Sequence, residues 1–344
     1  MKKLFFIAAI AGAALVGCTK NELAPSVTAQ EEISFAAPVV GAQTKVYGAI
    51  DATYNTGELF DVWCVYNVGD ITEWDGTTYF SDVKASYDVT ADGWTLNPKY
   101  YWPATGQLSF VALSPSITNS TTYDATNGFK ISEWSQGATE AAIVDLMYSD
   151  ESLNNEKADF SAAGEEKTGD ANSYTGVDIT FNHALSYLVF KIKTAGIYTP
   201  TQFRLNAITL SGIYTTGKFT QKASDPWEEK TDGTTGTYVA YTGGSLTFDD
   251  DPAVLVPETA PKEIILLPQK LVDGKQKLTI NYQISTDGAN WIDQVQEIDL
   301  SKGSITAWEM GKKYTYTLSI SMTEIILDPA VAVWDTTGSG TLDL

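Results

Sequence analysis

Cys18 is the residue whose chemistry the sequence specifies most clearly. It follows Leu15-Val16-Gly17, at the end of an apolar run that starts after two lysines. A basic start, a short apolar run and small residues before the cysteine resemble the cleavage site of a bacterial lipoprotein, in a segment too short to cross a bilayer. In such proteins the cysteine sulfur and the new amino terminus carry acyl chains, each worth about 0.8 kcal/mol per buried methylene. The sequence therefore predicts a signal peptide over residues 1–17 and lipidation at Cys18.

Residues 18–30 are polar and predict a tether between the lipid and the first strand. Thr19, rather than an aspartate, follows the cysteine, which resembles lipoproteins sent on to the outer membrane. We expect a surface-exposed protein anchored in the cell outer membrane, at least as a precursor. The alternative is a plain signal peptide in which Cys18 is incidental.

Other residue types that do chemistry are scarce. His183 is the only histidine, and it shares one strand face with three apolar residues, so we expect it in the core with a hydrogen bond to backbone. Cys64 lies in a strand-like apolar run and is interpreted as a small buried hydrophobe. Neither has partners that would complete a nucleophilic triad. The sequence predicts no catalytic residue, and an enzyme is the least expected class.

A run of three carboxylates, Asp249-Asp250-Asp251, offers the oxygen ligands that hard cations prefer. It lacks the spacing of an EF-hand loop, and no second acidic cluster is paired with it, so a solvated loop is favoured. Whether the run binds a cation stays open. No metal site and no cofactor are predicted.

The charge of the chain limits its partners. The formal net charge is −21, and loss of Lys2 and Lys3 with the signal makes the mature chain more acidic still. Phosphate binding needs clustered Lys and Arg, so nucleic acid is excluded as a partner.

The elements that would position these residues are strands. Leu278, Ile280, Tyr282 and Ile284 alternate with polar residues, the pattern of an antiparallel strand with one buried face. Residues 314–320 repeat it, whereas Ile264-Ile265-Leu266-Leu267 is continuously apolar and suits a strand covered on both faces. Short alternating runs with frequent turns predict an all-β chain of sandwiches.

The length of 344 residues is enough for two domains. The polar stretch 151–173 offers little to bury, so we place the boundary near residue 175. The predicted domains are an N-terminal β-sandwich over residues 31–175 and a C-terminal one over 176–344.

Several segments in this order resemble the fimbrillin family, the subunits of type V pili. They are Glu32-Ile33-Ser34-Phe35 with Gln43-Thr44-Lys45, Tyr100-Tyr101-Trp102-Pro103, Leu108-Ser109-Phe110-Val111-Ala112, Asp145-Leu146-Met147-Tyr148, Phe181-Asn182-His183-Ala184-Leu185-Ser186, Leu267-Pro268-Gln269 and Trp334. The resemblance implies two transthyretin-like antiparallel β-sandwich domains in tandem, lipoprotein export and assembly on the cell surface. The implied role is a stalk, tip or anchor subunit of an adhesive fimbria, with other fimbrial subunits as partners.

The resemblance also implies assembly by strand exchange, in which a protease removes the first strand and the groove accepts the carboxy-terminal strand of another subunit. Ile33 and Phe35 are the apolar side chains of the displaced strand. Lys45 matches the place where many relatives carry an arginine that a trypsin-like protease cuts. The only arginine of this chain is Arg204, so either Lys45 is cut by a protease of broader specificity or the chain is never cut.

The candidate donor is the apolar segment from Ile325 to Trp334, which is interrupted by Pro329. Its donor-strand candidates are Ile325, Leu327, Val331, Val333 and Trp334. The alternative is that these side chains complete their own C-terminal sandwich, which is favoured for an isolated chain because termini are often tied down by a strand.

A second function stays open, that of a monomeric surface lipoprotein that binds glycans through exposed aromatic rings. The densest aromatic group is Trp94, Tyr100, Tyr101 and Trp102. Aromatic faces stack on sugar rings, but strand cores also favour these residues, and the structural interpretation is preferred. Host proteins or glycans are the expected adhesion targets.

Overall fold

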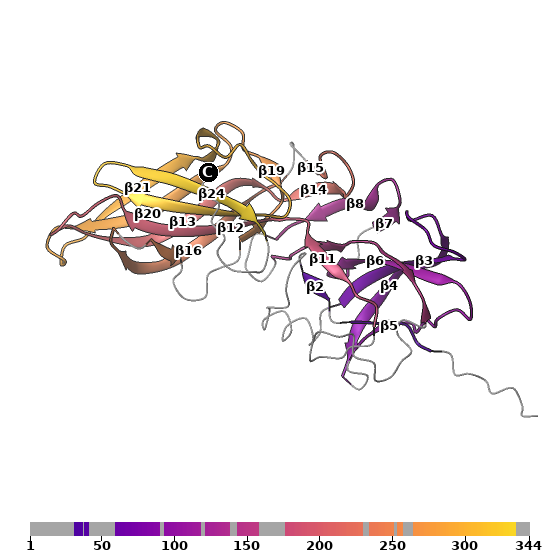
Figure 1. Cartoon of the computed structure of the whole chain (residues 1–344). Helices are drawn as coiled ribbons and strands as arrows, with labels where there is room; N and C mark the ends of the chain where they lie inside the picture. Colours follow the sequence, from indigo (N-terminus) through magenta and orange to yellow (C-terminus); the bar gives the residue numbers. More distant parts are fainter. Residues whose placement is uncertain are drawn as a thin grey trace, which may run out of the picture. The chain divides into compact units, whose positions relative to one another are not determined.

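Strands make up nearly all of the regular structure (Figure 1). The computed structural model describes residues 31–36, 38–40, 59–89, 93–117, 121–137, 143–157, 176–229, 234–250, 253–256 and 264–334. A short 3-10 turn, η3 (Leu300–Lys302), follows the strand that ends at Asp299. The all-β prediction is confirmed. The signal peptide, Cys18, the tether, Lys45 and residues 335–344 lie outside the described ranges.

The first half of the chain builds a nine-stranded sheet in the order β1-β5-β4-β3-β6-β9-β11-β2, with β10 paired to β6 off this path. Its strands are β1 (Ser34–Phe35), β2 (Val39–Val40), β3 (Leu59–Asn67), β4 (Thr77–Asp88), β5 (Gly93–Asn97), β6 (Gln107–Ser114), β9 (Met147–Ser149), β10 (Ser152–Asn155) and β11 (Thr180–His183). The two strands at opposite ends of this order, β1 and β2, come from one short stretch of chain. The sheet therefore curls until its two ends meet at that stretch.

A four-stranded sheet in the order β15-β14-β8-β7 lies beside the large sheet. It consists of β7 (Thr121–Asp124), β8 (Gly128–Ser135), β14 (Thr216–Thr220) and β15 (Trp227–Glu229). The pairing of β14 with β8 joins residues on both sides of the predicted boundary near residue 175, as does the pairing of β11 with β9. The division into two domains at that residue stays a prediction.

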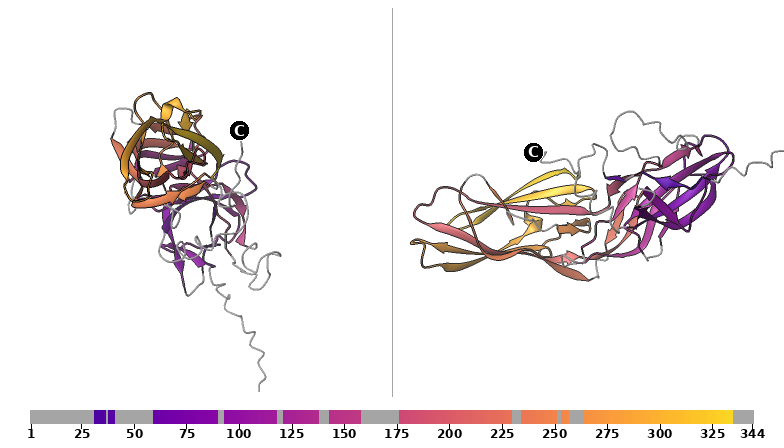
Figure 2. Two further views of the ribbon diagram at one scale, coloured as in Figure 1. Left: turned by 90° about the vertical axis from the view of Figure 1, so that its left-hand side faces the viewer. Right: turned by 90° about the horizontal axis from the view of Figure 1, so that it is seen from below.

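The second half of the chain forms two facing sheets, which appear as separate layers in Figure 2. One has the order β17-β12-β23-β24, with β18 also paired to β12, and the other has the order β16-β13-β20-β21. The strands are β12 (Ser186–Thr194), β13 (Gln202–Tyr214), β16 (Thr235–Phe248), β17 (Val254–Val256), β18 (Ile264–Leu266), β20 (Lys277–Ser285), β21 (Ile292–Asp299), β23 (Lys312–Ile320) and β24 (Ile325–Val333). A separate pair joins β19 (Gln269–Lys270) and β22 (Ala307–Trp308).

Three groups of buried apolar side chains hold these layers together. The N-terminal core, which includes Phe60 and Trp94, lies inside the curled sheet, and the C-terminal core lies between the two facing sheets. The middle core lies between the nine-stranded and the four-stranded sheets, and β6 shows the division. Its residues Phe110 and Ala112 face the N-terminal core, whereas Val111 faces the middle core.

The strand patterns predicted from the sequence are confirmed. On β20 the inward residues Leu278 and Ile280 are fully buried, and β23 buries its alternate residues in the same way. The apolar run at β18 is covered on both faces because Ile264 packs in the C-terminal core and Ile265 in the middle core.

Two polar stretches of the chain contain strands. β10 forms within residues 151–173, and β15 follows Pro226 with the indole of Trp227 buried in the middle core. The polar composition around Trp227 does not indicate a strand, yet burial of its indole in the middle core holds β15 in place. No helix among the described residues has the length and apolar character needed to cross a membrane.

Candidate functional site

The first segment, which we define as Glu31 to Val40, closes the curled sheet from both sides. On one side β1 pairs antiparallel with β5, and the Ile33 amide donates to the Tyr100 carbonyl at 2.9 Å. On the other side the Ala36 amide donates to the Val177 carbonyl at 3.0 Å, and the Val177 amide donates to the Ser34 carbonyl at 2.9 Å. β2 then pairs in parallel with β11. Removing the segment would expose two strand edges at once.

The side chains predicted for a displaced strand lie in the N-terminal core. Ile33 and Phe35 are both 0% exposed. The Phe35 ring meets those of Phe110 and Phe60 edge to face, with centroids 5.5 and 5.9 Å apart. Burial of each such side chain is worth about 1.5–3 kcal/mol. The first segment is therefore a structural part of this core, and its displacement stays a prediction.

Backbone contact at Gly176 is unusually close. A Cβ atom at this position would lie 2.4 Å from the carbonyl carbon of Phe35 and 2.5 Å from the Ala36 nitrogen. Because these neighbours are backbone atoms, they cannot rotate away, and only glycine fits beside the inserted segment. The need for glycine at position 176 could not be predicted from the sequence, because the close backbone atoms belong to a segment about 140 positions earlier.

Ion pairs add to the outer side of the first segment. Lys99 Nζ lies 2.6 Å from a Glu32 carboxylate oxygen, and Lys157 Nζ lies 3.6 Å from Glu31. The hydrogen bond to Glu32 raises the pKa of Lys99 above its ordinary value. Both pairs are exposed to solvent, which screens their attraction, so they add little to stability.

The predicted donor segment forms β24, an edge strand of its own C-terminal sandwich. It pairs with β23 over its whole length, with Pro329 opposite Tyr316. Ile325, Leu327 and Val331 pack against the C-terminal core. In this single chain the segment completes its own C-terminal sandwich, which is the arrangement favoured above for an isolated chain.

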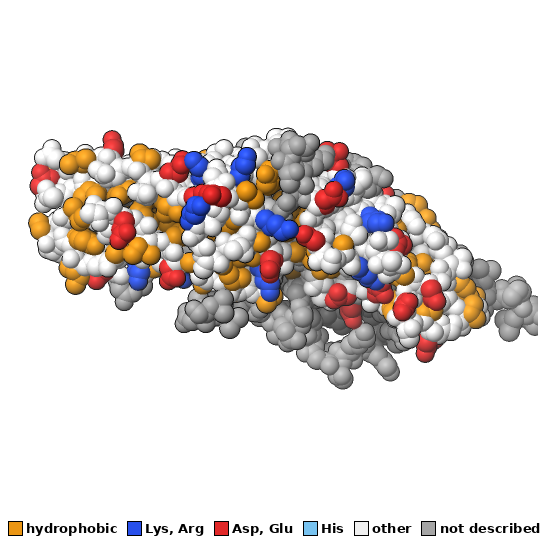
Figure 3. Space-filling view, turned by 90° about the horizontal axis from the view of Figure 1, so that it is seen from above, with side chains coloured by type: hydrophobic (Ala, Val, Ile, Leu, Met, Phe, Trp, Pro, Cys, Tyr) orange, Lys and Arg blue, Asp and Glu red, His pale blue; other side chains and the backbone are white. Residues whose placement is uncertain are grey.

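The outer face of β24 is mixed, because it carries Ile326, Asp328, Ala330 and Ala332, whereas Val333 belongs to the same face as Val331. Ile326 is 52% exposed and Val333 59%. On β21, the edge strand of the facing sheet, Ile292 and Val295 are 66% and 68% exposed and lie on opposite faces of the strand. Seen from above, the surface of the molecule carries apolar side chains with acidic and basic ones among them (Figure 3). Asp328 places a charge on the outer face of this edge strand, and exposed edges usually carry charges that prevent further pairing.

The chain at the end of β24 reaches the strand that borders the first segment. The Trp334 ring stacks on His183, with centroids 3.6 Å apart and planes at 3°. His183 is buried as predicted, but its Nδ1 lies 2.8 Å from a carboxylate oxygen of Asp145 rather than against a backbone group. Strand periodicity could not predict this partner, because Asp145 is 38 positions away and on a segment without regular structure.

The remaining residues that could do chemistry are in ordinary structural places. Cys64 is fully buried, and burial raises the pKa of its thiol well above the ordinary value. Asp249 is exposed, and its carbonyl accepts from the Thr194 amide, while Asp251 lies outside the described residues. Among the described residues no group of three or more His, Cys, Asp or Glu is placed to hold a metal ion.

The aromatic group considered for glycan binding packs inward. Trp94 is 0% exposed and Trp102 is 5% exposed, and the half-buried Tyr100 packs against the same N-terminal core. Buried rings offer no face to a sugar. Of the four aromatics, only the half-buried Tyr101 is outside this core.

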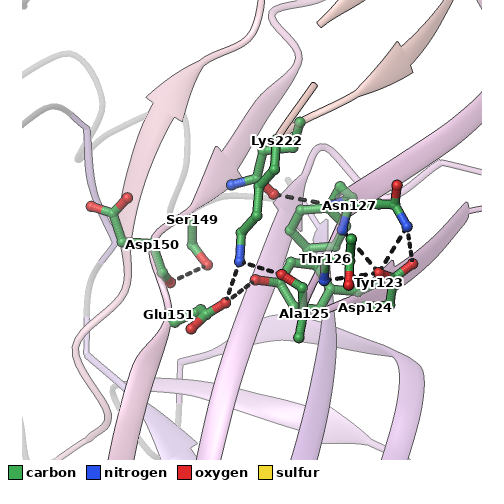
Figure 4. A network of polar contacts seen from close by, with 11 residues as sticks. Tyr123, Asp124, Ala125, Thr126, Asn127, Ser149, Asp150, Glu151 and Lys222 are labelled. Atoms are coloured by element: carbon green, nitrogen blue, oxygen red, sulfur yellow. Dashed lines mark hydrogen bonds and ion pairs between the residues drawn. The ribbon is translucent and has the colours of Figure 1, made fainter. Parts of the chain in front are cut away.

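A polar network joins the four-stranded sheet to the large one (Figure 4). The Tyr123 hydroxyl donates to a Glu151 carboxylate oxygen at 2.6 Å, and Lys222 Nζ donates to the same oxygen at 2.9 Å and to the Ala125 carbonyl at 3.0 Å. Burial, with help from Glu151, raises the pKa of Tyr123. The network therefore fixes the turn after β14 against segments of the first half.

The comparisons with known proteins agree with this fold. A family model described as fimbrillin-like matches residues 44–334. No curated protein matches the chain. A fimbrial protein of Bacteroides vulgatus is similar over 89% of this chain and 100% of its own, at 17% identity and a TM-score of 0.62. A protein of Bacteroides uniformis, described as a candidate for cell adhesion, is similar over 90% of this chain and 99% of its own, at 19% identity and a TM-score of 0.53.

Proposed function

The chain belongs to the fimbrillin-like family, and on this premise we propose that it is a structural subunit of a cell-surface fimbria, assembled by strand exchange and acting in adhesion. The first segment is the strand that leaves, and β24 is the strand that one subunit gives to the next. The precursor is anchored in the outer membrane through lipid on Cys18, and cleavage after Lys45 frees the first segment. The partners are other fimbrial subunits, and host proteins or glycans are the adhesion targets.

The observation that carries this proposal is the position of the first segment between two strand edges. Its loss leaves the free carbonyl of Tyr100 on one side and the free groups of Val177 on the other. Such paired edges supply backbone hydrogen bonds to any incoming strand, whatever its sequence. The pockets vacated by Ile33 and Phe35 would supply the selectivity, because they accept apolar side chains at alternate positions.

The exposed Ile326 side chain of β24 suits a strand that is buried more completely elsewhere. In its own sandwich only the face with Ile325, Leu327 and Val331 is covered. In a groove between two edges the face with Ile326 would be covered as well, and burial of apolar surface stabilises at about 25 cal/mol per Å². This exposed apolar side chain, which an isolated subunit does not need, supports a role as donor.

A contact in which the donor strand of one subunit fills the groove of another is head to tail. The donor surface and the acceptor surface are different parts of the chain, so the contact does not close into a dimer and generates a filament. Lys45 decides the role within that filament. A subunit cut there can accept a donor, whereas an uncut one keeps its lipid and its first segment and would serve as an anchor or accessory subunit.

The test is proteolysis of the purified mature chain with a trypsin-like protease. The sample is then run unboiled on a denaturing gel, and the products are sequenced from their amino termini. We expect a new terminus at Val46 and a ladder of multimers that resist detergent. Lys45→Gln is the matched control, because it removes the cleavage site and leaves the described residues unchanged.

The outcome that contradicts strand exchange is complete cleavage at Lys45 without any ladder. An intact chain under the same conditions would instead assign it the anchor or accessory role. The variant Leu327→Asp tests the donor and acceptor surfaces separately. Its groove should still accept the donor strand of a wild-type chain, whereas its own β24 should not act as a donor.

A further inference from the structure

Trp334 is the last described residue, and three contacts hold it against the strands that surround the middle core. Its ring stacks on His183 and lies 5.2 Å from the Tyr187 ring, with planes at 27°. Its amide donates to the Gly311 carbonyl at 2.7 Å. The end of β24 is therefore fastened by an aromatic stack, although the strand itself is a half-exposed edge.

The stack rests on a strand that also borders the first segment. His183 is the last residue of β11, and the same strand pairs with β2 through Thr180 and Phe181. Val177, which precedes β11, makes two backbone hydrogen bonds with the first segment. One strand of four residues thus contacts the first segment near one end and the end of β24 at the other.

The orientation of the imidazole is fixed by a side chain from a third segment. His183 Nδ1 lies 2.8 Å from Asp145 Oδ2, and the histidine side chain is 6% exposed. A parallel stack at 3.6 Å needs this fixed ring, because a freely rotating imidazole would lose the flat contact. Asp145 is a positioning residue for the stack.

We propose that the stack of Trp334 on His183 is a latch that keeps β24 in its own sandwich while the first segment fills the groove. This inference rests on the proposed function, because it concerns the strand that would be donated. The latch includes His183 and Tyr187 as platform, with Asp145 as support. It ties two events within one chain, the opening of the groove and the release of the donor.

The physical link is the support that β11 receives from its neighbours. With the first segment in place, β11 is paired on both sides, by β2 and by β9. When the segment leaves, β11 becomes an edge strand and Val177 loses its two hydrogen bonds to Ser34 and Ala36. Edge strands open locally more often than central ones. The His183 ring therefore spends more time away from its stacked position on Trp334. The end of β24 is then free to separate from β23.

An uncut chain is accordingly inactive in two ways. Its groove is filled, and its donor is held in place. The latch therefore prevents export intermediates from exchanging strands before the protease acts, which the exposed edge of β24 alone would permit.

Hydrogen exchange followed by mass spectrometry tests the latch on a dilute, monomeric full mature chain with Cys18→Ser. An aromatic stack contributes enough to change an opening equilibrium about three- to tenfold. We expect Trp334→Ala to speed exchange of the β24 amides by that factor, and Val333→Ala to leave them unchanged, because this neighbouring side chain is 59% exposed and outside the stack. Unchanged exchange in Trp334→Ala would overturn the latch.

The link to the groove is tested by Gly176→Ala, which pushes the first segment out without touching β24. We expect faster exchange both at the amides of Ile33 and Ala36 and throughout β24. Phe35→Ala, which weakens the same segment by a different route, should give the same result. Faster exchange in the first segment with β24 unchanged would overturn the link.

These measurements need no polymer, so they separate the latch from the proposed function. A latch that behaves as described in a chain that never forms a ladder would refute strand exchange alone. A ladder from a chain whose β24 exchange ignores Trp334 and Gly176 would refute the latch alone.

Discussion

Phe35→Ala should open the groove of the N-terminal core without cleavage of the chain. The ring is 0% exposed and packs edge to face on Phe110 and Phe60. Truncating a buried phenylalanine to alanine costs about 3–5 kcal/mol, including the cavity that is left. The loss falls on the first segment, which β1 and β2 hold by short ladders.

The size of the effect follows from that cost. A loss of about 4 kcal/mol, with an m-value of about 2 kcal/mol per molar urea, lowers the midpoint of unfolding by about 2 M. If the loss acts on the first segment, the open fraction of the groove rises about a thousandfold, because every 1.4 kcal/mol is a factor of ten. The apparent affinity for an incoming strand improves by the same factor as long as the open form is rare.

The assay is fluorescence anisotropy with a labelled peptide of the donor sequence Ile325 to Trp334, next to urea unfolding followed by circular dichroism. Phe219→Ala is the matched control, because its ring is 1% exposed and belongs to the middle core. Both variants should lower the unfolding midpoint, and only Phe35→Ala should bind the peptide more tightly. A midpoint within 0.3 M of wild type, or equal peptide binding by the two variants, would refute the reasoning.

Three further predictions concern other parts of the chain. Cys18→Ala should abolish incorporation of labelled palmitate and move the protein out of the membrane fraction, and continued lipid incorporation would show a different acceptor. Lys45→Gln should remove the terminus at Val46 in a trypsin digest while other fragments persist, and an unchanged amino terminus would locate the maturation site elsewhere. Hydrogen bonds from Ser301 and Gly274 hold the pKa of Asp299 at about 2, below its ordinary value of 3.8. Since the folded pKa is depressed, this stabilisation is present above about pH 4 and is lost as the pH falls toward 2; Asp299→Asn should flatten urea-midpoint profiles over that interval, and an unchanged slope would contradict the assignment.

The all-β class of the fold and the buried faces of several strands could be predicted from the amino-acid sequence alone. Alternation of apolar and polar residues is a local property, so β20 and β23 could be predicted with the correct buried faces, and the doubly covered strand at Ile264 to Leu266 likewise. The apolar nature of Ile33, Phe35 and the segment of β24 was also legible. These features depend on a residue and its near neighbours alone.

The pairing partners of the strands became known only from the tertiary structure. That β1 and β2 close the same sheet from opposite ends, that Gly176 must be a glycine, and that Trp334 stacks on His183 all depend on residues far apart in the chain. Strand periodicity carries no information on partners, because any strand edge offers the same backbone groups. The polar stretches that contain β10 and β15 were missed for the same reason, since each strand is fixed by contacts from elsewhere in the chain.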